Sequence, residues 1–372
     1  MVGVIFMDLK RAFETVDREL LIEKMLQYRI RGKVLEWFRS YLNNRKQRVW
    51  FNEEYSGIIT TKCGVPQGSV LGPLLFNVYI NDIVDVCPED CKIKMFADDT
   101  LVYVTGDNSA EVEIKMNSAL DIVEGWMNRN KLKINAEKTK YMIVRSVRKE
   151  LRGNITLKCR DGTELERVEV MRYLGIMIDD RLRFKDHCEY MIRKIGKKTS
   201  FLNRIGQCIS AYTRCVIYKA IIAPHFEYCV TLLVGMGETE LNKLQIAQNR
   251  AMRVILQCSR YVKIDDMLRA VQFMSVRQRL YYGVCIFVFK ALNDLIPKGL
   301  ARRLQVVRAG TGRVTRQADS IAIQFRTTRS AQKSVFYEGV KMYNELPMEI
   351  RECVGLVRYR RMLKEFIMGE ND

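Results

Sequence analysis

The stretch Phe96-Ala97-Asp98-Asp99-Thr100 decides how the rest of this 372-residue sequence is interpreted. Apolar, β-prone runs flank it at residues 93–96 and 101–104, so the pattern predicts a hairpin with two adjacent carboxylates at its tip. Neighbouring carboxylates repel each other, and one pKa rises unless a cation compensates. The stretch therefore predicts a site for a divalent cation or, as the plainer alternative, a solvated acidic turn.

A third carboxylate, Asp8, ends another β-prone run at residues 2–7, and a helical pattern follows it. If that strand lies beside the hairpin, three carboxylates converge into the oxygen-rich environment that Mg²⁺ prefers. Two such ions can stabilise the attacking and leaving oxygens of an in-line phosphoryl displacement. The alternative is that Asp8 only caps the helix that follows.

Strands and helices interleave up to about residue 180, a pattern that indicates an α/β or α+β sheet domain over residues 1–180. The expected helices cover residues 20–26, 34–42, 70–83 and 110–127, and further strands cover 141–144 and 170–178. Helical periodicity dominates from residue 184 to 297. We therefore expect a helical module over residues 181–298 and a basic C-terminal extension over residues 299–372, with arginines at Arg302, Arg303, Arg308, Arg313, Arg316, Arg326 and Arg329.

The charge of the chain is concentrated in its second part. Lys and Arg number 62 against 43 Asp and Glu, a net charge of +19 with a pI near 9.5. Residues 1–180 hold 28 basic and 27 acidic side chains, whereas residues 181–372 hold 34 and 16. This distribution predicts that the helical module contacts a polyanion such as nucleic acid.

Cysteine and histidine usage excludes several classes of protein. The 11 cysteines are odd in number and form no CxxC pair, which disfavours a disulfide framework and a zinc finger and favours reduced thiols inside a cell. Neither of the two histidines, His187 and His225, lies in a signature of nucleophilic catalysis. No apolar run is long enough to span a membrane and no signal peptide is recognisable, so we expect no membrane partner.

Five segments, in order, resemble the motifs of reverse transcriptases, and the resemblance is greatest to those of non-LTR (LINE-type, jockey-like) retrotransposons. The segments are Phe6-Met7-Asp8-Leu9-Lys10-Arg11-Ala12-Phe13, Gly64-Val65-Pro66-Gln67-Gly68-Ser69-Val70-Leu71-Gly72-Pro73, Phe96-Ala97-Asp98-Asp99-Thr100, Leu132-Lys133-Ile134-Asn135-Ala136-Glu137-Lys138-Thr139-Lys140 and Tyr173-Leu174-Gly175-Ile176. The resemblance implies a polymerase palm, an antiparallel sheet packed on helices, over residues 1–180. It also implies a helical thumb over residues 181–298.

The resemblance implies catalytic roles for particular side chains. Asp8, Asp98 and Asp99 would hold two Mg²⁺ ions, with Mn²⁺ as a substitute, and the carbonyl of Leu9 would assist at one of them. Lys138 would act near the leaving pyrophosphate as a general acid or a charge clamp. A solvated lysine is the competing interpretation of Lys138.

It also implies a set of binding residues. Phe13 would be the sugar gate that favours deoxynucleotides, although a core phenylalanine on a helix fits the same pattern. Gln67 and Gly68 would contact the incoming nucleotide, or they would simply form a turn. A primer grip would be formed by Tyr173, Leu174 and Gly175, for which a buried sheet edge is the alternative.

By this resemblance the partners are an RNA template, a DNA primer and deoxynucleoside triphosphates, and the location is the nucleus or a cytoplasmic ribonucleoprotein. The matching region begins at the family's first catalytic aspartate, so we expect a truncated polymerase with the fingers largely missing. A catalytically inactive remnant that only binds RNA or DNA is the alternative. A second alternative is another class of template-copying enzyme, an intron maturase or a telomerase-like enzyme, but residues 64–73 fit the LINE-type branch better. The sequence does not define an oligomeric state.

Overall fold

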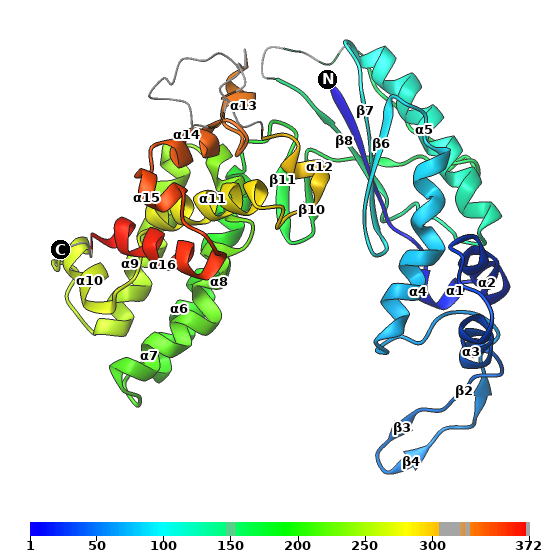
Figure 1. Ribbon diagram of the computed structural model, residues 1–372, viewed down its shortest axis with the longest axis horizontal. Helices are drawn as coiled ribbons and strands as arrows, with labels where there is room; N and C mark the ends of the chain where they lie inside the picture. Colours follow the sequence, from blue (N-terminus) through cyan, green and yellow to red (C-terminus); the bar gives the residue numbers. More distant parts are fainter. Residues whose placement is uncertain are drawn as a thin grey trace. The chain divides into compact units, whose positions relative to one another are not determined.

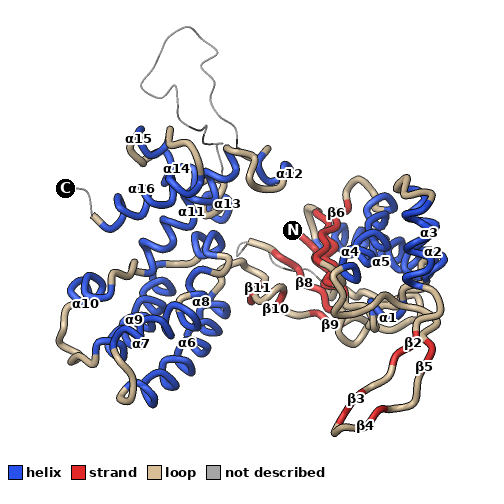
Figure 2. Tube along the Cα trace, turned by 60° about the horizontal axis from the view of Figure 1, so that its bottom comes forward, coloured by secondary structure: helices blue, strands red, loops and turns tan. Residues whose placement is uncertain are grey.

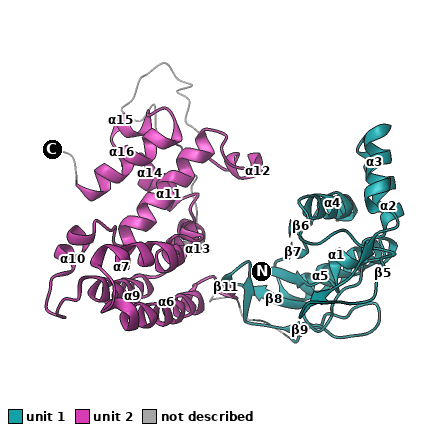
Figure 3. Cartoon of the chain, turned by 90° about the horizontal axis from the view of Figure 1, so that it is seen from below, with its two compact units in different colours: residues 1–176 teal, residues 177–372 magenta. Residues whose placement is uncertain are grey.

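The computed structural model describes residues 1–146, 149, 151, 153–304, 321, 323 and 328–369. The chain divides into two compact units, Met1–Ile176 and Met177–Asp372, which Figure 3 draws in different colours. The chain passes from the first unit to the second within strand β11 (Ile176–Asp179). The domain boundaries at residues 180 and 298 stay predictions.

The first unit is built on a five-stranded sheet with β1 at its centre (Figure 1). Its strands, in spatial order, are β6 (Cys91–Phe96), β7 (Asp99–Thr105), β1 (Val2–Met7), β8 (Lys140–Val144) and β9 (Glu166–Arg167). The first four pair antiparallel, and β9 pairs parallel to β8. Because β1 has a neighbour on each side and five buried residues, its sequence is an unbroken apolar run.

Helices complete the core of the unit, and α5 (Ser109–Arg129) among them packs on the sheet. They are α1 (Ala12–Thr15), α2 (Arg18–Gln27), α3 (Lys33–Leu42), α4 (Leu71–Ile80), the 3₁₀ helix η1 (Asn81–Val86) and α5. α5 lies directly against β1 at Gly3, where an added Cβ would be 2.1 Å from the sulfur of Met116. Gly3 is therefore required for the close approach of helix and sheet.

A long hairpin of residues 45–61 extends from the helical end of this unit (Figures 1 and 2). It contains two short ladders, β2 (Lys46–Gln47) with β5 (Ile59–Thr60) and β3 (Trp50–Phe51) with β4 (Glu54–Tyr55). All the residues of these four strands are exposed. This projecting hairpin is not among the elements expected from the sequence.

The second unit is largely helical. Helical periodicity indicated this for residues 184–297, but not for the helices found between residues 329 and 368. Its helices are α6 (Lys185–Gly206), α7 (Ala211–Ile217), the π-helix η2 (Tyr218–Ile222), α8 (Pro224–Glu227), the 3₁₀ helix η3 (Val230–Gly235), α9 (Glu238–Leu256), α10 (Ile264–Val271), α11 (Val276–Leu292), α12 (Lys298–Ala301), α13 (Arg329–Gln332), α14 (Glu338–Asn344), α15 (Met348–Arg351) and α16 (Leu356–Met368). Arg214 is buried and donates to the carbonyls of Gly206 at 2.5 Å and Ile255 at 2.7 Å, so it ties the ends of α6 and α9 together.

The C-terminal helices share a core with α11. The rings of Phe289 and Tyr359 stack with centroids 4.0 Å apart, and Tyr343 of α14 packs beside them. Both tyrosine side chains are almost completely buried. Four of the arginines that make the predicted extension basic, Arg308, Arg313, Arg316 and Arg326, lie outside the described residues.

One expected strand was wrong. Residues 170–178 form two strands, β10 (Val170–Tyr173) and β11, and a turn separates them. Leu174 and Gly175 have φ of 46° and 83°, values that end an extended strand. The apolar run at 70–83 is likewise not one helix, because α4 ends at Ile80 and the tighter η1 continues from it.

Candidate functional site

The tip of the β6–β7 hairpin carries two of the three predicted carboxylates. Phe96 pairs with Asp99, so Ala97 and Asp98 form a two-residue loop, and Ala97 has a φ of 53°. On the other side of β7, Thr100 pairs with Met7, the last residue of β1. Asp8 and Asp99 therefore extend the ends of two adjacent strands.

The electrostatics of the tip show that the three carboxylates interact. Partial burial raises the pKa of Asp99 above its usual value, and the negative charges of Asp98 and Asp8 raise it further. Like charges held at neighbouring strand ends oppose each other's ionisation. A bound cation would relieve this repulsion, and carboxylate oxygens are the donors that hard divalent ions prefer.

The carboxylates do not form a ready-made metal cage. Among the residues that the structure describes, no group of three His, Cys, Asp or Glu side chains is arranged to hold a metal ion. The donor chemistry of Asp8, Asp98 and Asp99 fits Mg²⁺, but their side chains would have to draw closer around it. The same residues contain no helix that is long and apolar enough to cross a membrane.

Asp8 is held by the loop that follows α5. The side-chain amide of Asn135 donates to Oδ2 of Asp8 at 3.0 Å, and the Asn135 backbone N–H donates to the Asp8 carbonyl at 2.8 Å. The hydroxyl of Thr139, which is fully buried, accepts the Asp8 N–H at 3.1 Å. The sequence alone indicates no role for Asn135 or Thr139, although both lie in the motif that contains Lys138.

The same loop runs alongside the residues after Asp8. Leu9, which is buried, forms an isolated β-bridge with Ile134, and the Lys10 N–H donates to the carbonyl of Lys133 at 2.9 Å. Lys138 is exposed, and its backbone N–H donates to the carbonyl of Asn135 at 3.1 Å. The loop therefore brings the backbone of Lys138 into the turn that positions Asp8.

Tyr173 joins the predicted primer-grip turn to the hairpin tip. Its ring packs on Phe6 with centroids 5.5 Å apart, and its hydroxyl donates to the carbonyl of Asp99 at 3.5 Å. Burial and the charge of Asp99 raise the pKa of Tyr173. Leu174 and Gly175, in the turn just beyond, are partly buried.

The loop at residues 64–69 is fixed to the segment that carries Phe13. The Gly64 and Val65 N–H groups donate to the carbonyls of Val16 at 2.7 Å and Phe13 at 2.9 Å. Gly64 has a φ of +82°, and a Cβ there would lie 2.8 Å from the carbonyl oxygen of Glu14, so only glycine fits. The ring of Phe13 packs on Phe76 with centroids 4.4 Å apart, yet Phe13 stays partly exposed.

Gln67 and Gly68 lie exposed in the middle of this loop. Gly68 has a φ of +78°, and no atom lies within 4 Å of where its Cβ would be. Next along the chain, the Ser69 hydroxyl donates to the Pro66 carbonyl at 2.8 Å and accepts the Gly72 N–H at 2.9 Å. The loop thus presents Gln67 and Gly68 to solvent and then leads directly into α4.

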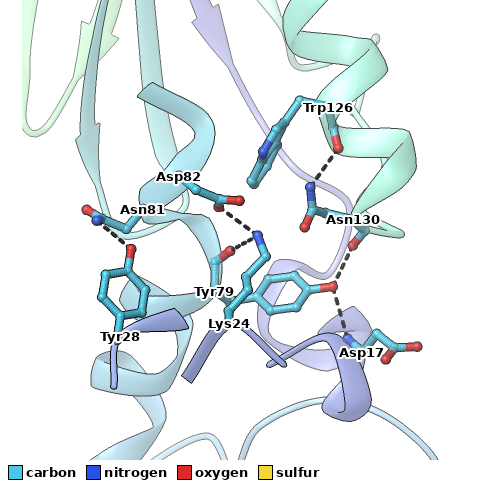
Figure 4. Close-up of polar contacts among 8 residues, drawn as sticks. All are labelled: Asp17, Lys24, Tyr28, Tyr79, Asn81, Asp82, Trp126 and Asn130. Atoms are coloured by element: carbon cyan, nitrogen blue, oxygen red, sulfur yellow. Dashed lines mark hydrogen bonds and ion pairs between the residues drawn. The ribbon is translucent and has the colours of Figure 1, made fainter. Parts of the chain in front are cut away.

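A buried lysine connects the helices behind the site (Figure 4). Lys24 is 7% exposed, and its ammonium donates to the carboxylate of Asp82 at 2.6 Å and to the Tyr79 carbonyl at 2.7 Å. It also lies 4.7 Å from the centroid of the Trp126 ring. Burial lowers the pKa of Lys24, and Asp82 partly offsets this. The contact joins α2, α4, η1 and α5.

Tyr79 extends this connection to the start of the loop that holds Asp8. Its hydroxyl donates to the carbonyl of Asn130 at 2.6 Å and accepts the Asp17 N–H at 3.3 Å (Figure 4). Asn130 is the C-cap of α5, and the segment that contains Asn135 begins directly after it. The buried network therefore fixes the point from which that segment departs.

In the second unit an open hollow of about 810 Å³ has basic and polar walls. Its lining comes from α6 and α9 and consists of Lys197, Thr199, Ser200, Asn203, Arg204, Arg250 and Val254. Three of these side chains are cationic, and three others carry hydroxyl or amide groups. This is a lining suited to phosphate oxygens.

Residues 2–178 match the family model described as reverse transcriptase (RNA-dependent DNA polymerase). The match includes β1, the hairpin with Asp98 and Asp99, and the loop with Gln67. This first unit is a reverse transcriptase domain.

Two relatives from Drosophila melanogaster narrow the class. The chain is 27% identical over 290 residues to the protein named "Probable RNA-directed DNA polymerase from transposon BS", covering 75% of this chain and 31% of that protein. It is 27% identical over 312 residues to the RNA-directed DNA polymerase from mobile element jockey, covering 80% of this chain and 33% of that protein. The chain is thus similar to polymerases of the jockey-like, non-LTR retrotransposon type, and it spans about a third of the length of these relatives.

The chain also aligns with a solved structure of apo telomerase from Candida tropicalis. The TM-score is 0.37 at 12% sequence identity, over 81% of this chain and 52% of that one.

Proposed function

We propose that this chain is the polymerase part of a retrotransposon protein and performs RNA-directed DNA synthesis. A primer 3′-hydroxyl would attack the α-phosphate of a deoxynucleoside triphosphate, forming a phosphodiester bond and releasing pyrophosphate. The observation that carries the proposal is the placement of Asp8, Asp98 and Asp99 at adjacent strand ends, with the pKa of Asp99 raised by the other two. The reverse transcriptase domain and its polymerase relatives support it.

In this proposal Asp8, Asp98 and Asp99, with the Leu9 carbonyl, hold two Mg²⁺ ions, for which Mn²⁺ could substitute. Such ions neutralise charge on the phosphates and lower the pKa of a coordinated hydroxyl. The task of the chain is to aim the carboxylates, and Asn135 and Thr139 support this by fixing Asp8. Much of the rate of such a reaction comes from this positioning.

The remaining predicted site residues take supporting roles. Phe13 is packed on Phe76 and would limit space at the ribose 2′ position, while the exposed Gln67 and Gly68 would meet the incoming nucleotide. Lys138 would act at the leaving pyrophosphate. Primer placement would fall to the turn that follows β10, with Tyr173, Leu174 and Gly175.

We also propose that the first unit acts as the palm and the second as the thumb. The hollow between α6 and α9 would then contact the phosphates of a template and primer duplex. Such contacts weaken steeply as salt increases. A nuclear or cytoplasmic ribonucleoprotein location belongs to the same proposal.

Primer extension on an annealed RNA template and DNA primer, with deoxynucleotides and Mg²⁺, tests the proposal. Asp98→Asn should abolish extension, whereas Asp85→Asn, at an exposed position on η1, should preserve it. Equal extension by both variants would refute the assignment of the site. If the wild-type chain binds RNA in a salt-sensitive manner but extends nothing, the alternative of a nucleic-acid-binding protein without polymerase activity is favoured.

A further inference from the structure

The projecting hairpin of residues 45–61 exposes aromatic side chains that proteins usually bury. The exposed fractions are 63% for Trp50, 73% for Phe51 and 59% for Tyr55. No described helix or strand of the first unit outside the hairpin covers them, and Figures 1 and 2 show the hairpin standing clear of the rest of that unit. Exposed aromatic clusters of this kind mark binding surfaces.

The register of the β3–β4 ladder places two of these rings, together with a guanidinium group, on one face of the hairpin. Trp50 pairs with Tyr55, so their side chains lie on the same side of the ladder, whereas the neighbouring Phe51 points to the opposite side. The guanidinium of Arg48 lies 3.7 Å from the centroid of the Tyr55 ring. Arg48, Trp50 and Tyr55 together are called the stacking face below.

We propose that the stacking face binds single-stranded nucleic acid. Flat aromatic rings stack on nucleobases regardless of sequence, and arginine can stack on a base or contact a phosphate. The cations Arg45, Lys46 and Arg48 lie along the first arm of the hairpin, whereas the acidic Glu53 lies in its turn and Glu54 begins β4. A polyanion therefore fits along the first arm. That this single strand is the RNA template rests on the function proposed above.

The base of the hairpin is anchored, so the stacking face keeps a fixed orientation to its own unit. Arg18, the first residue of α2, donates to the carbonyls of Thr61 at 2.7 Å, Cys63 at 2.9 Å and Gly64 at 3.0 Å. A second bond at 2.7 Å reaches the hydroxyl of Thr61. An anchored platform loses less conformational entropy on binding than a free loop.

The test uses the full chain and a labelled single-stranded RNA of about 12 nucleotides, a length within the usual range of such sites. Fluorescence anisotropy gives the affinity of the wild type, of Trp50→Ala combined with Tyr55→Ala, and of Phe51→Ala as the matched control on the opposite face. Quenching of tryptophan fluorescence provides a direct signal of stacking. The Trp50→Phe variant shows how much of the quenching comes from Trp50, because the other tryptophans are Trp37 and Trp126.

We expect the double variant to bind the single strand about tenfold to a hundredfold more weakly. Phe51→Ala should bind within about twofold of the wild type, and Trp50→Phe should lose most of the quenching. Unchanged affinity in the double variant, or an equal loss in Phe51→Ala, would overturn the proposal and favour a protein partner for this surface. Circular dichroism melting of each variant confirms that only the surface has changed.

The outcome is separable from that of the proposed function. Asp85→Asn, on η1 and outside the projecting hairpin, should bind the single strand as the wild type does. If the hairpin variants lose binding while the wild type extends no primer, the stacking face stands and the polymerase proposal fails. If primer extension depends on Asp98 but the hairpin variants bind the single strand normally, the polymerase proposal stands and the stacking-face proposal fails.

Discussion

The side-chain amide of Asn135 donates a hydrogen bond to Oδ2 of Asp8 at 3.0 Å, although 127 positions separate the two residues in the sequence. A second bond joins their backbones. The carboxylate at the end of β1 is therefore aimed by a loop that begins at the far end of α5. A residue such as Asn135 orients a metal-binding carboxylate without touching the substrate. Its loss therefore acts through the misplaced carboxylate.

Replacement of Asn135 by Ala should lower the rate of primer extension by about tenfold to a hundredfold, because Asp8 loses the bond that orients it. The apparent affinity for Mg²⁺ should weaken in parallel, which a purely structural role would not cause. Titration of extension with Mg²⁺ measures both effects. The control is Asn117→Ala on α5, an amide that donates to the carbonyls of Glu113 and Thr156 instead. Equal effects of the two variants would contradict the role given to Asn135.

The carboxylate cluster should make metal-free stability depend on pH. The pKa of Asp99 is raised in the folded chain above its usual value, so the folded state holds the proton more tightly than the unfolded state. That contribution is complete below about pH 4 and is lost as pH rises through the folded-state value. Urea unfolding gives the free energy of unfolding of the wild type and of Asp99→Asn as the pH is raised from about 4 through the folded-state pKa of Asp99. Over this range the free energy of unfolding of the wild type should fall relative to that of the variant.

Neutralising one of the neighbouring charges gives a complementary test. Asp98→Asn should raise the melting temperature of the metal-free chain at neutral pH, since Asp99 then ionises against less repulsion. Mg²⁺ should raise the melting temperature of the wild type more than that of the variant. A variant that Mg²⁺ stabilises as strongly as the wild type would show that Asp98 binds no metal.

Removing only one side chain of the buried Lys24–Asp82 ion pair should lower the free energy of unfolding substantially. Asp82→Ala leaves the ammonium of Lys24 buried without its carboxylate, and we expect a loss of about 3 kcal/mol in the free energy of unfolding. Combining it with Lys24→Met should cost less than the sum of the two single changes. Tryptophan fluorescence in urea reports this unit specifically, because Trp37, Trp50 and Trp126 all lie in it. Additive effects would show that the two side chains are not coupled.

Two glycines of one loop provide a matched pair. Gly64→Ala introduces a Cβ 2.8 Å from the Glu14 backbone at a positive φ, so the loop must move away from Phe13, at a cost of about 2 to 4 kcal/mol. Gly68→Ala meets no atom within 4 Å and carries only the cost of its positive φ, about 1 kcal/mol. Unfolding in urea measures both. Equal losses would mean that crowding at Gly64 is relieved without cost.

Much of the site's framework could be predicted from the sequence because it depends on local patterns. The strand at residues 2–7 was confirmed as β1, and the hairpin around Asp98 and Asp99 was confirmed because β-prone runs flank a two-residue turn. The helices at residues 20–26, 34–42 and 110–127 were confirmed within a few residues of their observed ends. Each of these depends on a periodicity that near neighbours create.

The contacts that aim the site could not be predicted in this way. Asn135 and Thr139 reach Asp8 only because β8 and its preceding loop lie beside β1, which the sequence does not encode locally. The division of residues 170–178 into two strands depends on a left-handed Leu174, an uncommon conformation for a residue with a bulky side chain. Sequence patterns report periodicity, whereas these features depend on tertiary pairing.

Arg18 has a mechanical consequence, because one guanidinium holds the segment between the projecting hairpin and the loop of Gln67 and Gly68. Load applied at the tip of the hairpin would pass along the backbone of residues 61–64, which this side chain ties to the start of α2. Lysine at this position would keep the charge but could not offer the planar fork that engages three residues at once. The connection between the projecting hairpin and the loop of Gln67 and Gly68 is therefore rigid. Tension on a nucleic-acid strand bound to the hairpin would be transmitted to the start of the loop that is proposed to receive the nucleotide.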